Sequence, residues 1–197
     1  MTMRRRKLVD NKWVTFLEDK FQLPNGTDCT YYHAQKSDAV MALVVDGDKT
    51  DGYTYIVNQH RHPIGRTIWQ FPIGGFNAST EDPIESARKE LREETGVVAG
   101  EMHYLGSFYA DPGFTNQKVH VCATNSILEI LEPKLETSEY GLISKKVQIS
   151  SLNSLIESGD MGDAWGIVGY HYLQKFLACI IHETPDSSTE PFFCSEF

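Results

Sequence analysis

Cysteine motifs and long apolar runs are missing from this 197-residue sequence. The four cysteines, Cys29, Cys122, Cys179 and Cys194, show neither CxxC nor zinc-finger spacing, which argues against a structural metal site or a redox motif. We expect the first three to be buried thiols of a cytoplasmic protein, because the cytosol keeps thiols reduced. No apolar stretch is long enough to span a membrane, and none follows the basic residues near the start, so we expect neither a membrane protein nor a signal peptide.

Positive charge is also limited. Lysine and arginine number 18 against 27 aspartates and glutamates, and the net charge is −9. This balance argues against broad binding to nucleic acid or to a membrane surface, both of which need basic patches. We expect the basic cluster from Arg4 to Lys7 to be a solvated tail. A small anionic ligand would need local positive charge, which Arg61, Arg66 and bound metal ions could supply.

The length fits one domain with an ample core and a small additional lobe. We expect an N-terminal β lobe over residues 1–36, a main domain over 37–183 and a C-terminal tail over 184–197. In the lobe, strand-like runs at Lys12–Leu17 and Asp28–His33 flank a Pro-Asn-Gly turn, which predicts a small β-hairpin.

The main domain mixes strand-like and helix-like segments. Expected strands are Ala39–Val45, Tyr53–Gln59, Met102–Tyr109, Lys118–Ile127 and Gly141–Ile149. Expected helices near the C-terminus are Ser151–Glu157 and Ala164–Ile181. This order predicts an α/β (α+β) protein in which a mixed β-sheet is sandwiched between helices.

The most informative segment runs from Gly75 to Val97 and contains a helix signal. Asp82 suits the N-cap, Pro83 suits the first helical position, and Gly96 ends the helix. The apolar positions at helical spacing, which should face the core, are Ile84, Ala87 and Leu91. The sequence therefore predicts a helix that ends just before Gly96.

Carboxylates gather on one face of this helix. Glu90 and Glu94 are four residues apart and share a face, Glu93 lies beside them, and Glu81 precedes the first turn. Like charges at this spacing repel one another unless a cation lies between them. Mg²⁺ or Mn²⁺ suits such a site, because both prefer carboxylate and water oxygens. A solvated acidic face is the alternative for a pair of glutamates, but the complete spacing favours a cation site.

The same segment resembles the Nudix box, the signature of the Nudix hydrolases. The family pattern is glycine, five residues, glutamate, seven residues, then Arg-Glu-aliphatic-X-Glu-Glu-X-Gly-aliphatic. Gly75, Glu81 and the run from Lys89 to Val97 match it except at Lys89, where the family has arginine. The resemblance implies the Nudix fold and the hydrolysis of a nucleoside diphosphate linked to another moiety, with divalent metal ions bound.

The resemblance also implies roles for individual residues. The implied ligands of Mg²⁺ (or Mn²⁺) are Glu90, Glu93, Glu94 and the carbonyl of Gly74, with Glu81 in the same metal-orienting cluster. The family arginine orients the glutamates through forked hydrogen bonds, whereas Lys89 offers a point charge without a fork. We therefore expect weakened but retained metal binding.

Flanking segments resemble the ADP-ribose pyrophosphatase branch of the family. Gln59-His60-Arg61 is similar to its Gln-aromatic-Arg motif, Trp69-Gln70-Phe71-Pro72 to its Trp-Glu-Leu-Pro segment, and Asp111-Pro112-Gly113-Phe114-Thr115 to its Ser-Pro-Gly-Phe-Ser segment. The implied substrate-binding residues are Gln59, Arg61, Trp69 and Phe114. Core packing is the competing interpretation for Trp69, and a surface salt bridge is the competing one for Arg61. Gln70 stands where the branch often has a metal-assisting glutamate, which leaves the number of metal ions open.

A general base must deprotonate the attacking water. In the branch it is often a glutamate on the loop before the last core strand, and here that loop contains Glu136 and Glu139. Glu139 is closer to the usual position and Glu136 is the reserve, while Glu93 could act as the base instead. A solvated loop acid is the competing interpretation.

These features predict metal-dependent hydrolysis of the pyrophosphate bond of a nucleoside diphosphate sugar. ADP-ribose, giving AMP and ribose 5-phosphate, is the favoured substrate. The alternatives are a Nudix hydrolase of another nucleotide sugar, a dinucleotide or a nucleoside triphosphate, and a non-catalytic Nudix sensor of ADP-ribose or NAD-derived ligands. An N-terminal β lobe in this branch often packs against a partner subunit, so the resemblance implies a homodimer.

Overall fold

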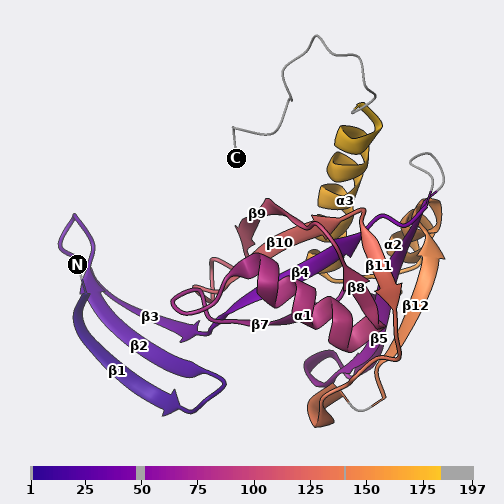
Figure 1. The fold of residues 1–197 in the computed structure, drawn as a ribbon. Coiled ribbons are helices and arrows are strands. Elements are labelled where there is room, and N and C mark those ends of the chain that lie inside the picture. Colours follow the sequence, from indigo (N-terminus) through magenta and orange to yellow (C-terminus); the bar gives the residue numbers. More distant parts are fainter. Residues whose placement is uncertain (1, 48–51, 140, 183–197) are drawn as a thin grey trace.

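A computed structural model describes residues 2–47, 52–139 and 141–182 (Figure 1). The N-terminal residues form an antiparallel sheet in the order β1 (Thr2–Asp10), β2 (Thr15–Gln22) and β3 (Asp28–Gln35). This sheet extends away from the main body of the molecule (Figure 1). The predicted hairpin is present as β2 and β3, and β1 adds a strand to it.

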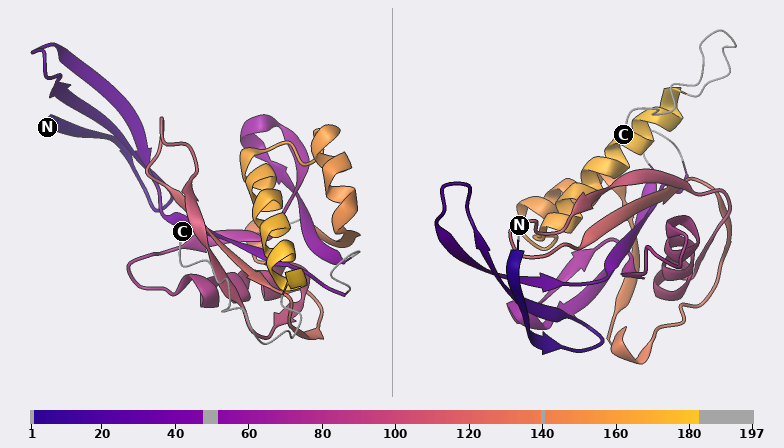
Figure 2. Two further views of the ribbon diagram at one scale, coloured as in Figure 1. Left: turned by 90° about the horizontal axis from the view of Figure 1, so that it is seen from above. Right: turned by 90° about the vertical axis from the view of Figure 1, so that its left-hand side faces the viewer.

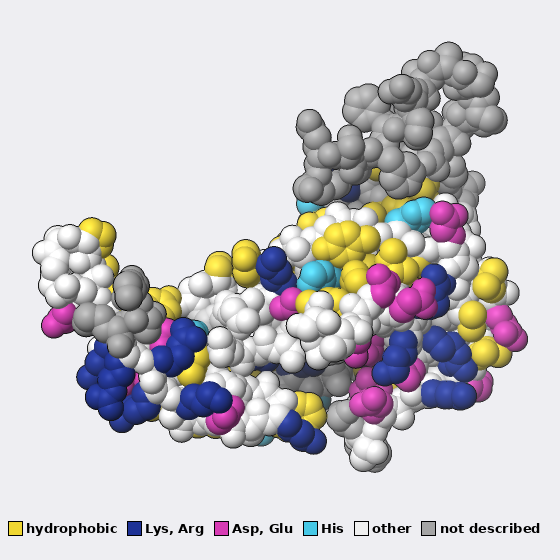
Figure 3. All heavy atoms as spheres, turned by 60° about the vertical axis from the view of Figure 1, so that its left-hand side comes forward, with side chains coloured by type: hydrophobic (Ala, Val, Ile, Leu, Met, Phe, Trp, Pro, Cys, Tyr) yellow, Lys and Arg dark blue, Asp and Glu magenta, His cyan; other side chains and the backbone are white. Residues whose placement is uncertain are grey.

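The prediction that the basic cluster is a solvated tail is wrong, because Arg4 to Lys7 lies within β1. The register places Arg5 opposite Asp19 and Arg6 opposite Glu18. Arg5 donates from Nε and Nη2 to the two carboxylate oxygens of Asp19, both at 2.7 Å, and Arg6 contacts Glu18 at 3.1 Å. Opposite charges across an antiparallel pair stabilise it, so the cluster forms a strand. Figure 3 shows Lys and Arg side chains gathered on this sheet.

In the part of the chain that the structure describes, the main body contains three further sheets. They have the strand orders β7-β4-β10-β9, β12-β5-β6 and β11-β8. The strands are β4 (Asp38–Val44), β5 (Tyr53–Arg61), β6 (Arg66–Gln70), β7 (Ile73–Phe76), β8 (Val97–Ala99), β9 (His103–Tyr109), β10 (Lys118–Thr124), β11 (Ile127–Ile130) and β12 (Ile143–Gln148). β4 runs parallel to β10, whereas β7 is antiparallel to β4 and β9 is antiparallel to β10, so the sheet is mixed.

Helices cover both faces of the mixed sheet. They are α1 (Pro83–Thr95), α2 (Leu152–Glu157) and α3 (Ala164–His182), with 3₁₀ turns η1 (His62–Ile64), η2 (Thr137–Glu139) and η3 (Ile149–Ser151). Figure 2 shows α1 and α3 on opposite sides of the sheet. On the α3 side, alternate β4 residues such as Met41 and Leu43 pack with Leu173, while on the α1 side Val40 packs with Leu91. The predicted sandwich is therefore confirmed.

The predictions for the shorter strands and for the cysteines are only partly correct. The expected strand Lys118–Ile127 divides into β10 and β11, and the short strands β6, β7 and β8 were not predicted. Cys122 is buried and Cys29 is partly buried, but the prediction of a buried thiol is wrong for Cys179, which lies on an exposed face of α3. Cys194 lies outside the described residues.

No helix in the described ranges is both long and apolar enough to cross a membrane.

Candidate active site

Helix α1 has the ends that the sequence predicts. The Oδ1 atom of Asp82 accepts hydrogen bonds from the backbone nitrogens of Ile84 at 2.9 Å and Glu85 at 3.0 Å. Gly96 has a left-handed conformation with a φ of 80°, and its nitrogen donates to the carbonyl of Arg92. These caps fix where the helix begins and ends, and thereby which face of α1 presents the glutamates.

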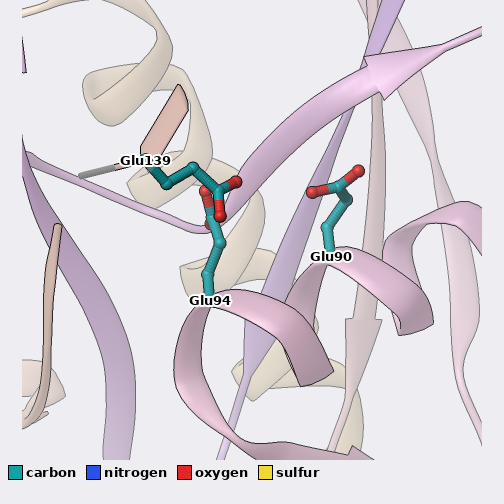
Figure 4. Close-up of side chains that lie close together, drawn as sticks. All are labelled: Glu90, Glu94 and Glu139. Carbon is teal, nitrogen blue, oxygen red and sulfur yellow. The ribbon is translucent and has the colours of Figure 1, made fainter. Parts of the chain in front are cut away.

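Three carboxylates meet at this helix. Glu90 and Glu94 of α1 and Glu139 of η2 each offer an oxygen, and these oxygens all lie within 4.8 Å of one another. In Figure 4, Glu90 and Glu94 extend from α1 and Glu139 reaches toward Glu94 from η2. We call Glu90, Glu94 and Glu139 the glutamate trio. Hard oxygen donors at this spacing are the donor set that Mg²⁺ and Mn²⁺ prefer, so the residues present fit a divalent cation.

Burial makes negative charge on Glu90 and Glu94 unfavourable without a cation. Glu94 is 3% exposed, and burial, followed by repulsion from Glu139 and Glu90, raises its pKa to about 8. The hydrogen bond from the backbone nitrogen of Ile73, at 3.1 Å, opposes this rise. Burial also raises the pKa of Glu90 to about 7. A bound divalent cation would favour the ionised carboxylates and release these protons.

Gly74 lies directly against the trio. It is part of β7, where it pairs with Val40 of β4. A Cβ atom at position 74 would overlap the carboxyl group of Glu90, so only glycine fits there without displacing that side chain. Gly74, whose carbonyl is an implied metal ligand, is therefore packed beside Glu90, a second implied ligand.

Glu93 and Lys89 form a pair on the exposed side of α1. The Nζ atom of Lys89 lies 3.5 Å from Oε2 of Glu93, and the lysine side chain is 61% exposed. Attraction to Glu93 raises the pKa of Lys89 despite partial desolvation. Glu81, another implied member of the cluster, accepts a hydrogen bond from the backbone nitrogen of Asn77 at 2.8 Å. Glu93 and Glu81 thus have partners other than the glutamate trio.

The loop before β12 directs Glu139 toward α1. The Oε2 atom of Glu139 accepts a hydrogen bond from the backbone nitrogen of Glu136 at 2.7 Å. Its carbonyl accepts one from the nitrogen of Leu142 at 2.9 Å. Glu136 is exposed, and its charge contributes to the raised pKa of Glu90. Of the two candidate bases, Glu139 is therefore the one that joins the trio.

Arg61 lies at the end of β5 in a partly buried polar chain. Its Nε donates to the Oε1 of Gln70 at 2.6 Å, and the Nε2 of Gln70 donates to Asp163. Burial lowers the pKa of Arg61, while attraction to Glu94 and then to Asp163 opposes this shift. Of the glutamate trio, Glu94 therefore lies close enough to attract Arg61. Nothing in the sequence spacing between Asp163 and Arg61 marked Asp163 as a neighbour of this site.

The remaining predicted substrate-binding residues have other surroundings. Gln59 is half-buried on β5 opposite Ile68 of β6. Trp69 packs against the larger core cluster, as its competing interpretation proposed.

Phe114 is 49% exposed and contacts the N-terminal sheet. Its ring centroid lies 6.1 Å from that of Phe16, and its carbonyl accepts a hydrogen bond from the nitrogen of Ala34. A cavity of about 440 Å³ beside Phe114 is also lined by Tyr31 and His33 of β3. The loop that carries Phe114 is therefore held between the N-terminal sheet and the main body.

Comparisons with known proteins show what this chain is similar to. A family model described as NUDIX domain matches residues 35–145. An ADP-ribose pyrophosphatase of Bacillus subtilis is 30% identical over 174 residues, which cover 88% of this chain and 91% of that relative. An ADP-ribose pyrophosphatase of Mycobacterium tuberculosis is 26% identical over 151 residues, covering 77% and 72% of the two chains. A crystal structure of an ADP compounds hydrolase is similar with a TM-score of 0.75 and 14% identity, over 90% of this chain and 94% of that chain.

The chain therefore belongs to the Nudix family. The predicted Nudix fold is confirmed by the similar crystal structure. The predicted enzyme class, a Nudix pyrophosphohydrolase, is confirmed by the family match together with the relatives. Enzymes of this family generally use divalent metal ions, in agreement with the oxygen donors of the trio.

Proposed function

We propose that this protein hydrolyses ADP-ribose to AMP and ribose 5-phosphate and that it requires Mg²⁺ or Mn²⁺. The observation that carries the proposal is the glutamate trio, which gathers three oxygens within 4.8 Å of one another beside Gly74. The names of the two bacterial relatives support ADP-ribose as the substrate.

Glu90, Glu94, Glu93 and the Gly74 carbonyl would hold the metal. Bound Mg²⁺ or Mn²⁺ would supply neutralisation of the charge on the phosphoryl oxygens. Arg61 would pair with the diphosphate, because its guanidinium lies within electrostatic reach of Glu94. Glu139 would take the proton of the attacking water, with Glu136 as the reserve base and Glu93 as the other alternative. Lys89 would orient Glu93, which lies 3.5 Å away.

Substrate recognition would involve both the N-terminal sheet and the main body. Phe114 would stack on the adenine, since its loop borders the cavity beside the N-terminal sheet. Gln59 and Trp69 would line the substrate site from the paired strands β5 and β6, where Gln59 lies opposite Ile68 and Trp69 lies opposite Asn58.

We further propose that residues 1–36 form a lobe that packs against a second copy in a homodimer, and that the enzyme works in the cytoplasm. Light scattering with gel filtration tests the dimer, and a single-chain mass would reject it.

The decisive assay for the reaction is product release from a panel of nucleotide sugars, dinucleotides and nucleoside triphosphates with Mg²⁺ or Mn²⁺. We expect AMP from ADP-ribose and a large loss of turnover in Glu94→Gln. The matched control is Glu85→Gln, on the same helix, because the Glu85 side chain is 69% exposed. Within the described ranges its ion pair is with Arg88, at 3.5 Å. Preferential cleavage of another panel member would reject the substrate. Binding of ADP-ribose without turnover of any member would favour the sensor alternative.

A further inference from the structure

A partly buried polar chain links the end of β5 to the residue before α3. Arg61 donates from Nε to Gln70, and Gln70 donates from Nε2 to the Oδ2 of Asp163. Gln70 is 3% exposed. A buried amide is stable only when its oxygen and its nitrogen both have partners, and here both do.

Glutamine is chemically suited to this place. Its amide oxygen accepts from the guanidinium, and its amide nitrogen donates to a carboxylate, so one side chain joins two opposite charges. A leucine of similar volume could do neither. An ionised glutamate could accept from Arg61 but would face the carboxylate of Asp163 with a like charge.

Asp163 anchors the far end of the chain. Its Oδ1 accepts a hydrogen bond from the backbone nitrogen of Gly166 at 2.8 Å, in the first turn of α3. The preceding segment is tied to β6, because the backbone nitrogen of Trp69 donates to the carbonyl of Asp160 at 2.8 Å. Asp163 is thus held at the start of α3, and the segment before it is bound to β6, the strand that carries Gln70.

We propose that Gln70 is a positioning residue that fixes the plane of the Arg61 guanidinium for contact with the diphosphate of the substrate. The guanidinium is planar, so a hydrogen bond at Nε sets the direction of the rest of the group. Glu94 and Asp163 both attract Arg61, and the hydrogen bond to Gln70, at 2.6 Å, holds the Nε side of its guanidinium. This inference rests on the proposed hydrolysis of a nucleoside diphosphate.

The first test measures the hydrogen bond itself and needs neither metal nor substrate. Nitrogen-15 NMR would follow exchange of the Arg61 Nε proton with water, its signal being assigned from its loss in Arg61→Ala. We expect slow exchange in the wild type, faster exchange in Gln70→Leu, and no change in Gln174→Leu. Gln174 is a suitable control because it is exposed on α3. Equal exchange in the wild type and in Gln70→Leu would overturn the proposal.

The second test is a double-mutant cycle on KM and kcat for ADP-ribose. A hydrogen bond to a charged group supports a rise in KM of roughly tenfold in Gln70→Leu, with a smaller change in kcat. The same substitution should have no further effect on KM in the Arg61→Ala background. A purely structural role would lower Tm in both backgrounds and leave KM unchanged, and that result would overturn the proposal. Additive effects of Gln70→Leu and Arg61→Ala on KM would also overturn it. Absence of turnover in the wild type would instead reject the proposed function, while the exchange rates still decide whether Gln70 holds Arg61.

Discussion

Without a bound cation, the buried carboxylate of Glu94 should make the protein less stable as the pH rises. The ordinary pKa of this group is 4.5, and the folded protein raises it to about 8. Between these values the folded chain holds a proton that the unfolded chain has released, so each increase in pH favours unfolding. The stabilisation by the protonated group is complete below about pH 4.5 and is lost as the pH rises through 8.

The size of the effect follows from the pKa interval. At 1.36 kcal/mol for each pKa unit, the rise in the Glu94 pKa corresponds to a loss on the order of 3–5 kcal/mol in the free energy of unfolding across the interval. This is a large part of the 5–15 kcal/mol that is roughly typical of a folded domain. Mg²⁺ at about 100 times its Kd should raise the free energy of unfolding at pH 8 by about 2.7 kcal/mol, because it binds the folded state.

Urea unfolding in EDTA from pH 5 to pH 8, followed by tryptophan fluorescence, measures this dependence. Glu94→Gln should make this dependence shallower without abolishing it. The amide is neutral and its oxygen can still accept the hydrogen bond from Ile73, whereas burial still raises the pKa of Glu90. Glu85→Gln should retain the wild-type slope. Equal stability at pH 5 and pH 8 in the wild type, or an unchanged slope in Glu94→Gln, would refute the reasoning.

Three further substitutions have defined outcomes. Gly74→Ala should displace the carboxyl group of Glu90 and weaken Mn²⁺ binding at least tenfold in a calorimetric titration, an effect on the order of 1.4 kcal/mol; unchanged affinity would contradict the packing described for Gly74. Lys89→Arg should tighten Mn²⁺ binding in the same titration, because a fork holds Glu93 better than the single 3.5 Å contact of lysine; weaker binding would contradict this view. Thr54→Val should raise the free energy of unfolding by about 1 kcal/mol, since the buried Thr54 hydroxyl has no hydrogen-bond partner among the described residues. A loss of stability in urea would show that this hydroxyl does have a partner.

The sequence predicted local features better than it predicted pairings. The caps of α1 and the buried positions Ala87 and Leu91 follow from spacing within one helix, and the structure has them. Strands β6 and β7 were missed because they are short and are separated by Phe71 and Pro72, so that their pairing partners define them. The basic cluster was misjudged for a related reason, since its carboxylate partners on β2 are brought opposite it only by the strand register.

The sequence by itself determined the family and the acidic face of α1, and it predicted that a divalent cation suits this face. Positions four residues apart on a helix are neighbours whatever the rest of the chain does, so Glu90 and Glu94 could be paired from spacing alone. Only the tertiary structure decided that Glu139, rather than Glu93, completes the trio, and that Gln70 joins Arg61 to Asp163, 93 residues away from Gln70. These contacts connect separate elements of the fold, and their geometry depends on how the loop before β12 and the start of α3 pack against the sheets.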